Sequence, residues 1–329
     1  NKVDGLIVKI EGDPECPQNW GKTCAKGNSG HMSLYDPHRV LFPMRRTNPE
    51  KGFDVDPKWE RISWDEALEI VTARLKKIRA EDPRKLVISS FDTRGQSGVF
   101  FGAWAAACGT PNFWGGGAQY FCGNGYHPVT YLTHGTWFGE PDVRRCRYLM
   151  LFGTQNGSVS NHLPMDLAAK MADARMAGMK LIVVDPVGIN AASKAHEWVP
   201  IRPGTDGALA LAMINVLLNE EGKYDRDFLA KFTNGPYLIR EDGHYLRDGE
   251  SGKPLLWDES AARPRPFDDP AMGSVALEGR FPVDGKQFPT AFTLFKEHVR
   301  QYSPESAAPI TTIAADTIRR LAREFGEAA

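Results

Sequence analysis

The sequence of 329 residues predicts an α/β fold in which helices cover a parallel β-sheet. Two observations support this prediction: the chain contains short apolar runs of strand type, and segments of helical periodicity alternate with them. The strand-type runs are Lys85–Ser90, Tyr148–Phe152 and Lys180–Val184. The helical segments lie near Phe100–Ala107, Pro164–Ala177 and Asp206–Leu218. Strands that alternate with helices are expected to run parallel to one another.

The chain before this alternation contains one short strand and one well-defined helix. Up to about Arg46 it is rich in Gly, Pro and Asn, and only Leu6–Ile10 is an apolar run of strand type. Ser63, with Glu66 three residues later, forms a capping box. Apolar residues then recur at helical spacing, namely Ala67, Leu68, Val71, Leu75 and Ile78. We therefore expect a helix to begin after Ser63.

The last third of the chain contains a loop-rich segment and a final helix. Residues 234–287 are rich in Pro and Gly, and we interpret them as an insertion with β-hairpins. The segment Thr312–Ala329 has the periodicity of an amphipathic helix. Its predicted inward residues are Ile313, Ile318, Leu321, Ala322 and Phe325.

Composition and charge exclude several classes of function. The formal net charge is -1, from 40 Lys and Arg against 41 Asp and Glu, so the chain has no basic field to hold nucleic acid. No apolar run approaches the ~20 residues of a membrane helix, so we expect a soluble subunit that reaches a membrane only through partners. The 5 cysteines are odd in number and lack the spacing of a disulfide scaffold. Because the sequence opens at Asn1 rather than at Met, we expect residues to precede it.

An acidic residue, Asp185, follows the strand-type run Lys180–Val184 and directly precedes Pro186. At the carboxyl end of a parallel strand, a carboxylate is well placed to accept hydrogen bonds from a ribose diol. The alternative is that Asp185 only caps the turn before a helix. This segment by itself leaves both interpretations open.

A second acidic residue, Asp206, follows Gly204 and Thr205 directly before a helical segment. An ionised Asp accepts two parallel hydrogen bonds from the N–H edge of guanine, and a helix N-terminus favours its negative charge. The alternative is that Thr205 or Asp206 is an N-cap and nothing more.

A third turn follows the run Tyr148–Phe152 and opens toward a helix. Its residues are Gly153, Thr154, Gln155 and Asn156. A turn of small residues between a strand and a helix lets backbone N–H groups approach a pyrophosphate. The turn is not G-x-G-x-x-G, so the ordinary nicotinamide-binding pattern is absent and a simple dehydrogenase is disfavoured.

Taken in order, these turns resemble the molybdopterin dinucleotide-binding segment of the dimethyl sulfoxide reductase superfamily. The similar stretches are Leu149–Gln155, Leu181–Pro186, Trp198–Ala212, Gly12–Pro14, Gly21–Gly27, Tyr35–Pro43 and the final helix. The resemblance implies the N-terminal portion of a catalytic subunit with bis-molybdopterin guanine dinucleotide, Mo or W, and a [4Fe–4S] cluster. It implies three parts: an iron–sulfur domain remainder over residues 1–47, an α/β segment over 48–140, and a dinucleotide-binding α/β domain over 141–329.

The resemblance also implies roles for individual residues. Cys24 corresponds to the fourth cysteine ligand of the cluster, with the other three expected before Asn1. Lys26 corresponds to a lysine between the cluster and the pterin. Gln155 stands where the family usually has Asn, so its side chain is longer although its amide chemistry is the same. The domain that holds the second dinucleotide is expected after Ala329.

In this superfamily a side chain in the loop before the dinucleotide strand binds the metal. We predict Cys122 as that ligand, because a soft thiolate in a Gly-rich loop can approach a metal that already carries pterin sulfurs. The alternative is a small buried hydrophobic thiol. Cys108, in an apolar helix, and Cys146, at the start of a strand, compete less well for the metal. The next candidates are Asp142 and Ser158.

Two histidines near this loop, His127 and His134, are candidate proton carriers, with His127 preferred as a catalytic residue. The alternative is that both are hydrogen-bonded structural residues. The resemblance implies two-electron chemistry on a small-molecule substrate, by oxygen-atom transfer, hydroxylation or reduction of a sulfur compound. Partners would be an iron–sulfur electron-transfer subunit, plus a membrane quinone subunit.

The residues around Cys122 favour one branch of the superfamily. Cys122 is followed by Gly-Asn rather than by His, which points away from formate dehydrogenases and toward polysulfide and thiosulfate reductases and phenylacetyl-CoA–acceptor oxidoreductases. Two alternatives remain. The same cofactor supports non-redox hydration, and an inactive scaffold subunit of a respiratory complex would keep the fold without the metal.

Overall fold

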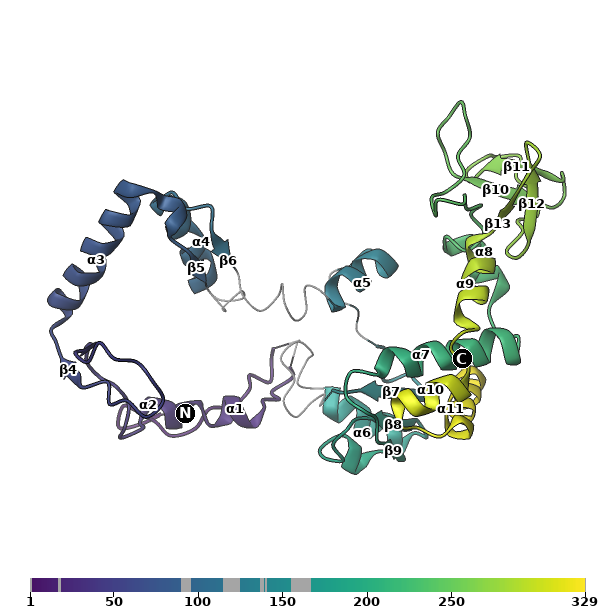
Figure 1. Cartoon of the computed structure of the whole chain (residues 1–329). Coiled ribbons are helices and arrows are strands. Elements are labelled where there is room, and N and C mark those ends of the chain that lie inside the picture. The colour runs from purple at the N-terminus through teal and green to yellow at the C-terminus, as the bar shows by residue number, and fades with distance from the viewer. Residues whose placement is uncertain are drawn as a thin grey trace. The chain divides into compact units, whose positions relative to one another are not determined.

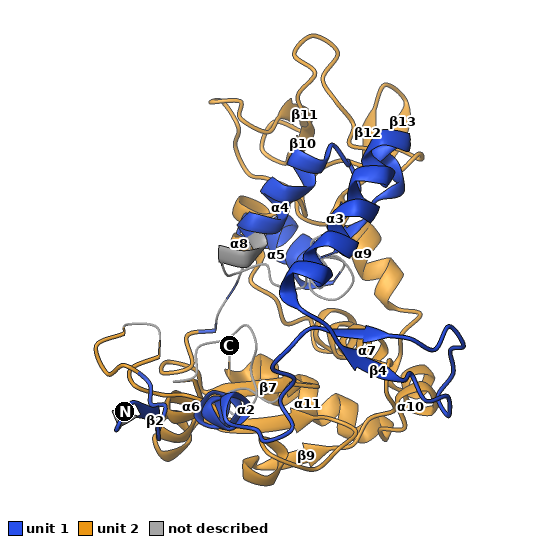
Figure 2. Ribbon diagram, turned by 90° about the vertical axis from the view of Figure 1, so that its left-hand side faces the viewer, with its two compact units in different colours: residues 1–12, 25–141 blue, residues 13–24, 142–329 orange. Residues whose placement is uncertain are grey.

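The computed structural model describes residues 2–16, 19–89, 96–114, 125–136, 139, 141–154 and 167–328. The chain divides into two compact units (Figure 2). Unit 1 comprises residues 1–12 and 25–141, and unit 2 comprises residues 13–24 and 142–329. No helix in the described part of the chain is long and apolar enough to cross a membrane.

Unit 1 begins with small antiparallel hairpins and short helices. The hairpins pair β1 (Lys2–Val3) with β2 (Leu6–Ile7), and β3 (Met44–Arg46) with β4 (Trp59–Arg61). The short helices are α1 (Ala25–Asn28) and α2 (Gly30–Leu34). The strand predicted over Leu6–Ile10 is therefore present but ends at Ile7.

The helix predicted after Ser63 is α3 (Trp64–Glu81). Ser63 Oγ accepts a hydrogen bond from the N–H of Glu66 at 3.1 Å, as the capping-box pattern predicts. The carboxylate of Glu66 instead accepts a hydrogen bond from Arg45 Nη1 at 2.6 Å, which joins the start of α3 to β3.

A parallel strand pair also belongs to unit 1. It joins β5 (Ile88–Ser89) and β6 (Phe113–Trp114), with α4 (Gln96–Cys108) between them in sequence. The strand predicted over Lys85–Ser90 begins later, because Pro83–Lys85 forms a 3₁₀ turn. Helix α5 (Tyr126–His134) follows.

The central element of unit 2 is a parallel sheet with the strand order β7-β8-β9. The strands are β7 (Tyr148–Phe152), β8 (Lys180–Val184) and β9 (Glu197–Val199). Strands β7 and β8 have the bounds predicted from sequence, whereas β9 is not predicted. A mixed α/β fold with a parallel sheet is therefore confirmed.

Helices cover both faces of this sheet (Figure 1). Alternate residues of a strand point to opposite faces, so a strand covered on both sides is apolar throughout. One face packs on α6 (Leu167–Met176), and the other packs on α7 (Asp206–Asn215) and α11 (Ala315–Ala328). Ile182 and Val184 have no exposed area on one face, and Val183 is 1% exposed on the other.

The C-terminal helices are α9 (Ala291–Val299), α10 (Pro304–Thr311) and α11. The final helix begins three residues later than predicted, because Thr312 has a left-handed conformation, with φ 68°, that ends α10. Ile318, Leu321 and Ala322 are buried as predicted. Phe325 was predicted to point inward but is 45% exposed, with its ring beside that of Tyr148, the first residue of β7.

The loop-rich segment contains the predicted hairpins. They pair β10 (Leu255–Asp258) with β11 (Arg263–Pro266), and β12 (Arg280–Val283) with β13 (Lys286–Pro289). Helix α8 (Arg226–Phe232) precedes them. Leu238, Leu255, Trp257 and Ala276 form a separate small core for the segment.

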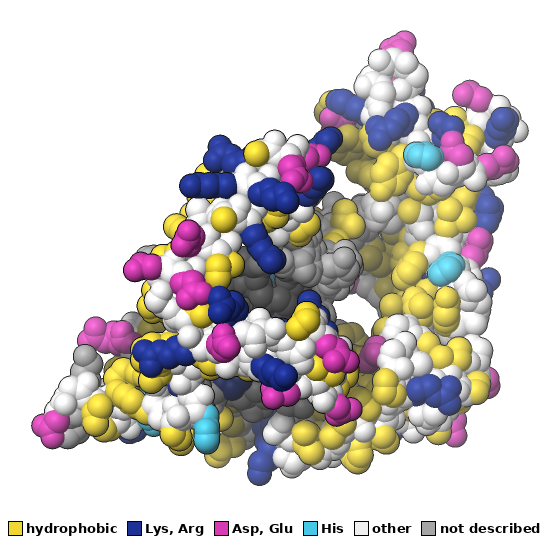
Figure 3. Space-filling view, turned by 60° about the vertical axis from the view of Figure 1, so that its left-hand side comes forward, with side chains coloured by type: hydrophobic (Ala, Val, Ile, Leu, Met, Phe, Trp, Pro, Cys, Tyr) yellow, Lys and Arg dark blue, Asp and Glu magenta, His cyan; other side chains and the backbone are white. Residues whose placement is uncertain are grey.

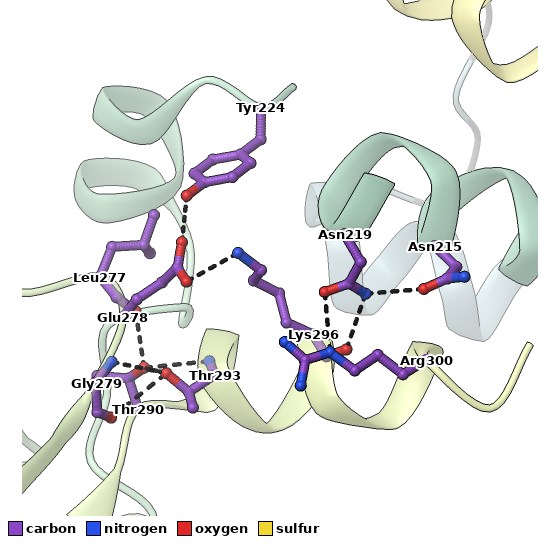
Figure 4. A network of polar contacts seen from close by, with 10 residues as sticks. All are labelled: Asn215, Asn219, Tyr224, Leu277, Glu278, Gly279, Thr290, Thr293, Lys296 and Arg300. Atoms are coloured by element: carbon purple, nitrogen blue, oxygen red, sulfur yellow. Dashed lines mark hydrogen bonds and ion pairs between the residues drawn. The ribbon is translucent and has the colours of Figure 1, made fainter. Parts of the chain in front are cut away.

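A polar network joins this segment to helix α9 and to the helical turn that follows α7 (Figure 4). Glu278 accepts a hydrogen bond from Tyr224 and pairs with Lys296 of α9 at 2.9 Å. The backbone of the same lysine is also bonded, because Asn219 Nδ2 donates to the Lys296 carbonyl oxygen at 3.1 Å. Asn219 belongs to a π-helical turn, Val216–Glu220, that continues α7, so α9 ties the hairpins to the helix beside the sheet.

Candidate cofactor-binding site

The three turns predicted to bind a dinucleotide all follow the carboxyl ends of the parallel strands of unit 2. Gly153 and Thr154 follow β7, Asp185 and Pro186 follow β8, and the turn that contains Gly204 comes after β9. The Gly153 N–H donates to the Val184 carbonyl at 2.9 Å. The Asp185 N–H donates to the Val199 carbonyl at 3.2 Å. Backbone hydrogen bonds therefore hold the ends of the three strands side by side.

Two glycines shape these turns. Gly153 has φ 55° and Gly204 has φ 78°, in the left-handed region that disfavours a side chain. Among the described residues, no atom lies within 4 Å of a Cβ built at either position, so no described side chain packs against either glycine. Gln155 and Asn156, which were predicted to continue the first turn, lie outside the described residues.

Asp185 both caps a turn and retains an acceptor. Its side chain is 8% exposed, and Oδ1 accepts a hydrogen bond from the Val187 N–H at 2.8 Å. The turn-capping alternative is therefore present in the structure. Oδ2 makes no hydrogen bond to the residues that the structure describes, so the carboxylate retains acceptor capacity.

Helix α7 begins without a side-chain cap. Thr205 is at the N-cap position, but its hydroxyl donates to the Arg202 carbonyl at 2.6 Å instead of accepting from the helix. Asp206 is the first helical residue and is half-buried. Within the described ranges, no hydrogen bond or ion pair engages its carboxylate. The N-cap alternative therefore does not describe the side chain of either residue.

At the opposite, amino edge of the sheet, charged and polar side chains of the strands contact helix α11. Tyr148, Lys180 and Glu197 are the first residues of β7, β8 and β9. The Glu324 carboxylate of α11 accepts a hydrogen bond from the Tyr148 hydroxyl at 3.0 Å and pairs with Lys180 at 2.8 Å. Arg320 pairs with Glu197 at 2.6 Å. Burial, followed by the hydrogen bond to Glu324, raises the pKa of Tyr148 well above its usual value.

The predicted iron–sulfur residues are half-buried or exposed. Cys24 is half-buried, and Lys26 is exposed on α1. The loop before Cys24 is ordered by the Asp13 carbonyl, which accepts from the N–H groups of Cys16 at 3.1 Å and Gly21 at 2.9 Å. Over the described residues, no group of three or more His, Cys, Asp or Glu has the geometry to hold a metal ion.

The predicted metal ligand Cys122 lies outside the described residues, as does Ser158. His127 is 3% exposed in α5, with its ring 5.5 Å from that of Tyr126. His134 ends the same helix and contacts the Thr133 hydroxyl at 2.7 Å. The structure therefore gives His127 the more enclosed position of the two.

The other candidate metal ligands among the described residues are Cys146, Cys108 and Asp142. Cys146 donates from Sγ to the Tyr148 carbonyl at 3.0 Å, at the amino edge of the sheet. Cys108 is the half-buried last residue of α4. Asp142 lies 3.7 Å from Arg145. The position of Cys146 agrees with its prediction as a thiol remote from the carboxyl edge.

One residue at the carboxyl edge, Trp198, was not singled out from the sequence. Its indole Nε1 donates to the backbone oxygen of Asp185 at 2.7 Å. The only signal for it is its position at the start of the stretch Trp198–Ala212. A hydrogen bond across strands leaves no local pattern in the sequence.

Comparison with known proteins places the chain in a family. A model of the molybdopterin oxidoreductase family matches residues 39–317. The chain belongs to this family. A model of the Fe4S4 domain of molybdopterin oxidoreductases matches residues 1–36. The predicted family, a molybdopterin cofactor and a [4Fe–4S] cluster are therefore confirmed, whereas the guanine dinucleotides and the choice of Mo or W stay predictions.

Individual relatives include enzymes of different reactions. The chain is 39% identical to a sulfite dehydrogenase subunit of Allochromatium vinosum over 98% of this chain and 34% of that protein. It is 32% identical to the thiosulfate reductase molybdopterin-containing subunit of Salmonella typhimurium over 71% of this chain and 29% of that protein. The solved acetylene hydratase from Pelobacter acetylenicus has a TM-score of 0.60 at 26% identity, over 98% of this chain and 36% of that one. The chain thus spans about a third of the length of such molybdopterin oxidoreductases.

Proposed function

We propose that the chain is the dinucleotide-binding part of a Mo or W bis-pterin oxidoreductase that exchanges electrons through a [4Fe–4S] cluster. The observation that carries this proposal is the gathering of Gly153, Asp185 and Asp206 after the carboxyl ends of β7, β8 and β9. Ligands of open α/β sheets bind outside this edge of the strands. The proposed division is 1–47, 48–140 and 141–329, with an insertion at about 234–287.

The residues at this edge suit the parts of a guanine dinucleotide. The turn after β7, predicted from Gly153, Thr154, Gln155 and Asn156, would approach the pyrophosphate through backbone N–H groups other than that of Gly153, which donates to the Val184 carbonyl. Asp185, before Pro186, has one carboxylate oxygen left to accept from a ribose hydroxyl. Asp206, after Gly204, accepts from the N–H edge of guanine, and its place in the first turn of α7 favours the ionised form.

The metal site is proposed from residue chemistry. Cys122 binds Mo or W through its thiolate. His127, in its enclosed position on α5, holds or moves a proton near the substrate. Cys24 ligates the cluster, and Lys26 lies between cluster and pterin. The bound metal supplies a centre that changes oxidation state by two electrons.

The substrate class we propose is a sulfur oxyanion. Two relatives are named for sulfite and thiosulfate, and the sulfite dehydrogenase matches 98% of the chain. The reaction is then an oxygen-atom transfer or the reduction of a sulfur compound. Several relatives are named as subunits, so the partners we propose are an iron–sulfur electron-transfer subunit, plus a membrane quinone subunit.

The mixed charges of the surface agree with a small-molecule substrate rather than with nucleic acid. On the face shown in Figure 3, the coloured Lys and Arg side chains are interspersed with Asp and Glu. The formal net charge is -1. The coloured side chains on this face form no extended basic field for a phosphate backbone.

The proposal is tested on the purified full-length protein. Elemental analysis is expected to find Mo or W together with iron, and acid treatment is expected to release guanine nucleotide. Sulfite-dependent reduction of a redox dye then tests the substrate class. Iron without Mo or W, and without guanine nucleotide, would indicate the inactive scaffold protein instead.

Hydration is the second candidate function. It is favoured by the acetylene hydratase of Syntrophotalea acetylenica, which is 34% identical over 73% of this chain and 32% of that protein. A hydratase would contain the same cofactors but would transfer no electrons to a dye while converting its substrate. Metal content therefore separates the scaffold from both enzymes, and dye reduction separates the two enzymes.

A further inference from the structure

Trp198 of β9 contacts the turn that carries Asp185. The indole Nε1 donates to the Asp185 carbonyl oxygen at 2.7 Å. The Asp185 N–H donates to the carbonyl of the next residue of β9, Val199, at 3.2 Å. Both backbone polar groups of Asp185 are therefore held by neighbouring residues of one strand.

Gly188 lies close to the six-membered ring of the same indole. A Cβ built on Gly188 would lie 2.9 Å from Cζ3 and 3.0 Å from Cε3 of Trp198. Carbon atoms in favourable contact lie about 3.5–4.0 Å apart, so any side chain at Gly188 must displace the ring. The backbone of Gly188 is not in the left-handed region. The ring, rather than the backbone conformation, requires glycine here.

The same turn leaves one oxygen of Asp185 without a described partner. Oδ1 accepts from the Val187 N–H at 2.8 Å, whereas Oδ2 makes no hydrogen bond to the residues in the described ranges. The carboxylate is 8% exposed, so its direction depends on the turn that holds it. A shift of the turn would therefore change the direction of Oδ2.

We propose that Trp198 and Gly188 are positioning residues for the dinucleotide, acting through Asp185. The inference rests on the proposed function, in which Asp185 accepts a hydrogen bond from the ribose. The indole N–H fixes the carbonyl of Asp185, and the absence of a side chain at Gly188 lets the indole approach. Neither residue needs to touch the cofactor.

One substitution removes the indole N–H donor, and another removes the space that Gly188 leaves for the indole. Trp198→Phe keeps an aromatic side chain at this position but removes the N–H donor. Gly188→Ala keeps the donor but displaces the ring. Each is expected to speed the loss of guanine nucleotide from the purified holoenzyme during dialysis about fivefold, the effect of one hydrogen bond of ~1 kcal/mol. Gly249→Ala is the matched control, because no atom of the described residues lies within 4 Å of a Cβ built at Gly249.

A double variant distinguishes positioning from a general structural role. If Trp198 acts through Asp185, adding Trp198→Phe to an Asp185→Asn variant has no further effect. The double variant then loses nucleotide no faster than Asp185→Asn alone. Additive losses, with a matching fall in melting temperature, would overturn the positioning role. Rapid loss from Asp185→Asn but wild-type retention by both Trp198→Phe and Gly188→Ala would also overturn it, while leaving the proposed function intact. Full retention by Asp185→Asn would overturn the proposed anchor itself.

Discussion

Lys180 and Glu324 form an ion pair of 2.8 Å that joins the first residue of β8 to helix α11. The Glu324 carboxylate also accepts a hydrogen bond from Tyr148, the first residue of β7, at 3.0 Å. Arg320, one turn before Glu324, reaches both Glu324 and the first residue of β9. The amino edge of the sheet is thus fixed to one helix, and the carboxyl edge carries the turns of the proposed site.

Glu324→Gln is expected to lower the free energy of unfolding by about 1 kcal/mol, a value between those of buried and exposed charged pairs. The substitution keeps the size of the side chain and removes its charge. Urea unfolding measures the effect. Glu327→Gln, on the same helix and exposed, is the matched control and is expected to change the midpoint little. Equal effects of the two substitutions would contradict a specific role for Glu324.

The contribution of Glu324 is expected to depend on pH. Burial raises the pKa of Glu324, but hydrogen bonds from Lys180, Arg320 and Tyr148 outweigh it and hold the pKa below its ordinary value. Because the pKa of Glu324 is lower in the folded protein than in the unfolded chain, the ionised carboxylate stabilises the fold at pH values above the unfolded pKa of about 4.3. This stabilisation is lost as the pH falls through the folded pKa. Melting temperatures of wild type and Glu324→Gln are therefore expected to differ at pH 7 and to converge toward pH 3. A constant difference across this range would rule the linkage out.

Thr290→Val is expected to lower the free energy of unfolding by about 1–3 kcal/mol, because it leaves buried polar groups unpaired. Thr290 is fully buried at the N-cap of α9. Its hydroxyl donates to the Leu277 carbonyl at 2.7 Å and accepts from the Thr293 N–H at 3.2 Å. Thermal unfolding measures the loss. Thr72→Val, at an exposed position of α3, provides the comparison, and similar losses at both positions would argue against the cap.

Cys122→Ala is expected to abolish turnover and to alter the Mo(V) or W(V) paramagnetic resonance signal. Cys108→Ala and Cys146→Ala are expected to leave that signal unchanged, because Cys146 lies at the amino edge of the sheet and bonds to the Tyr148 carbonyl. Full activity and an unchanged spectrum in Cys122→Ala would refute Cys122 as the ligand and direct attention to Asp142 or Ser158.

The sequence predicts those parts of the fold that leave a local pattern. The bounds of β7 and β8 were predicted because both faces of these strands are buried, which makes their sequences apolar except for Lys180 at the start of β8. Strand β9 was missed because it has three residues and begins with Glu197. The start of α11 was misplaced because the left-handed conformation of Thr312 leaves no mark in the apolar periodicity.

The candidate site was predictable to a similar extent. Asp185 and Asp206 were identified because strand, turn and helix follow one another in sequence. The contact of Trp198 with the Asp185 carbonyl was not, because it joins residues on neighbouring strands. Whether Thr205 caps α7 also depends on a side-chain rotamer, which directs the hydroxyl to the Arg202 carbonyl.

The central claim is that the carboxyl edge of the sheet binds a guanine dinucleotide through Asp206. It is tested most directly by the guanine nucleotide content of purified Asp206→Asn. Asn presents an amide donor where guanine requires an acceptor, a mismatch of about 1–3 kcal/mol. Asp206 is the first residue of α7, and within the described residues its carboxylate makes no hydrogen bond or ion pair, so its replacement by Asn is expected to change folding stability little. We predict a large loss of bound nucleotide with a nearly unchanged melting temperature. Wild-type nucleotide content in Asp206→Asn would contradict the account.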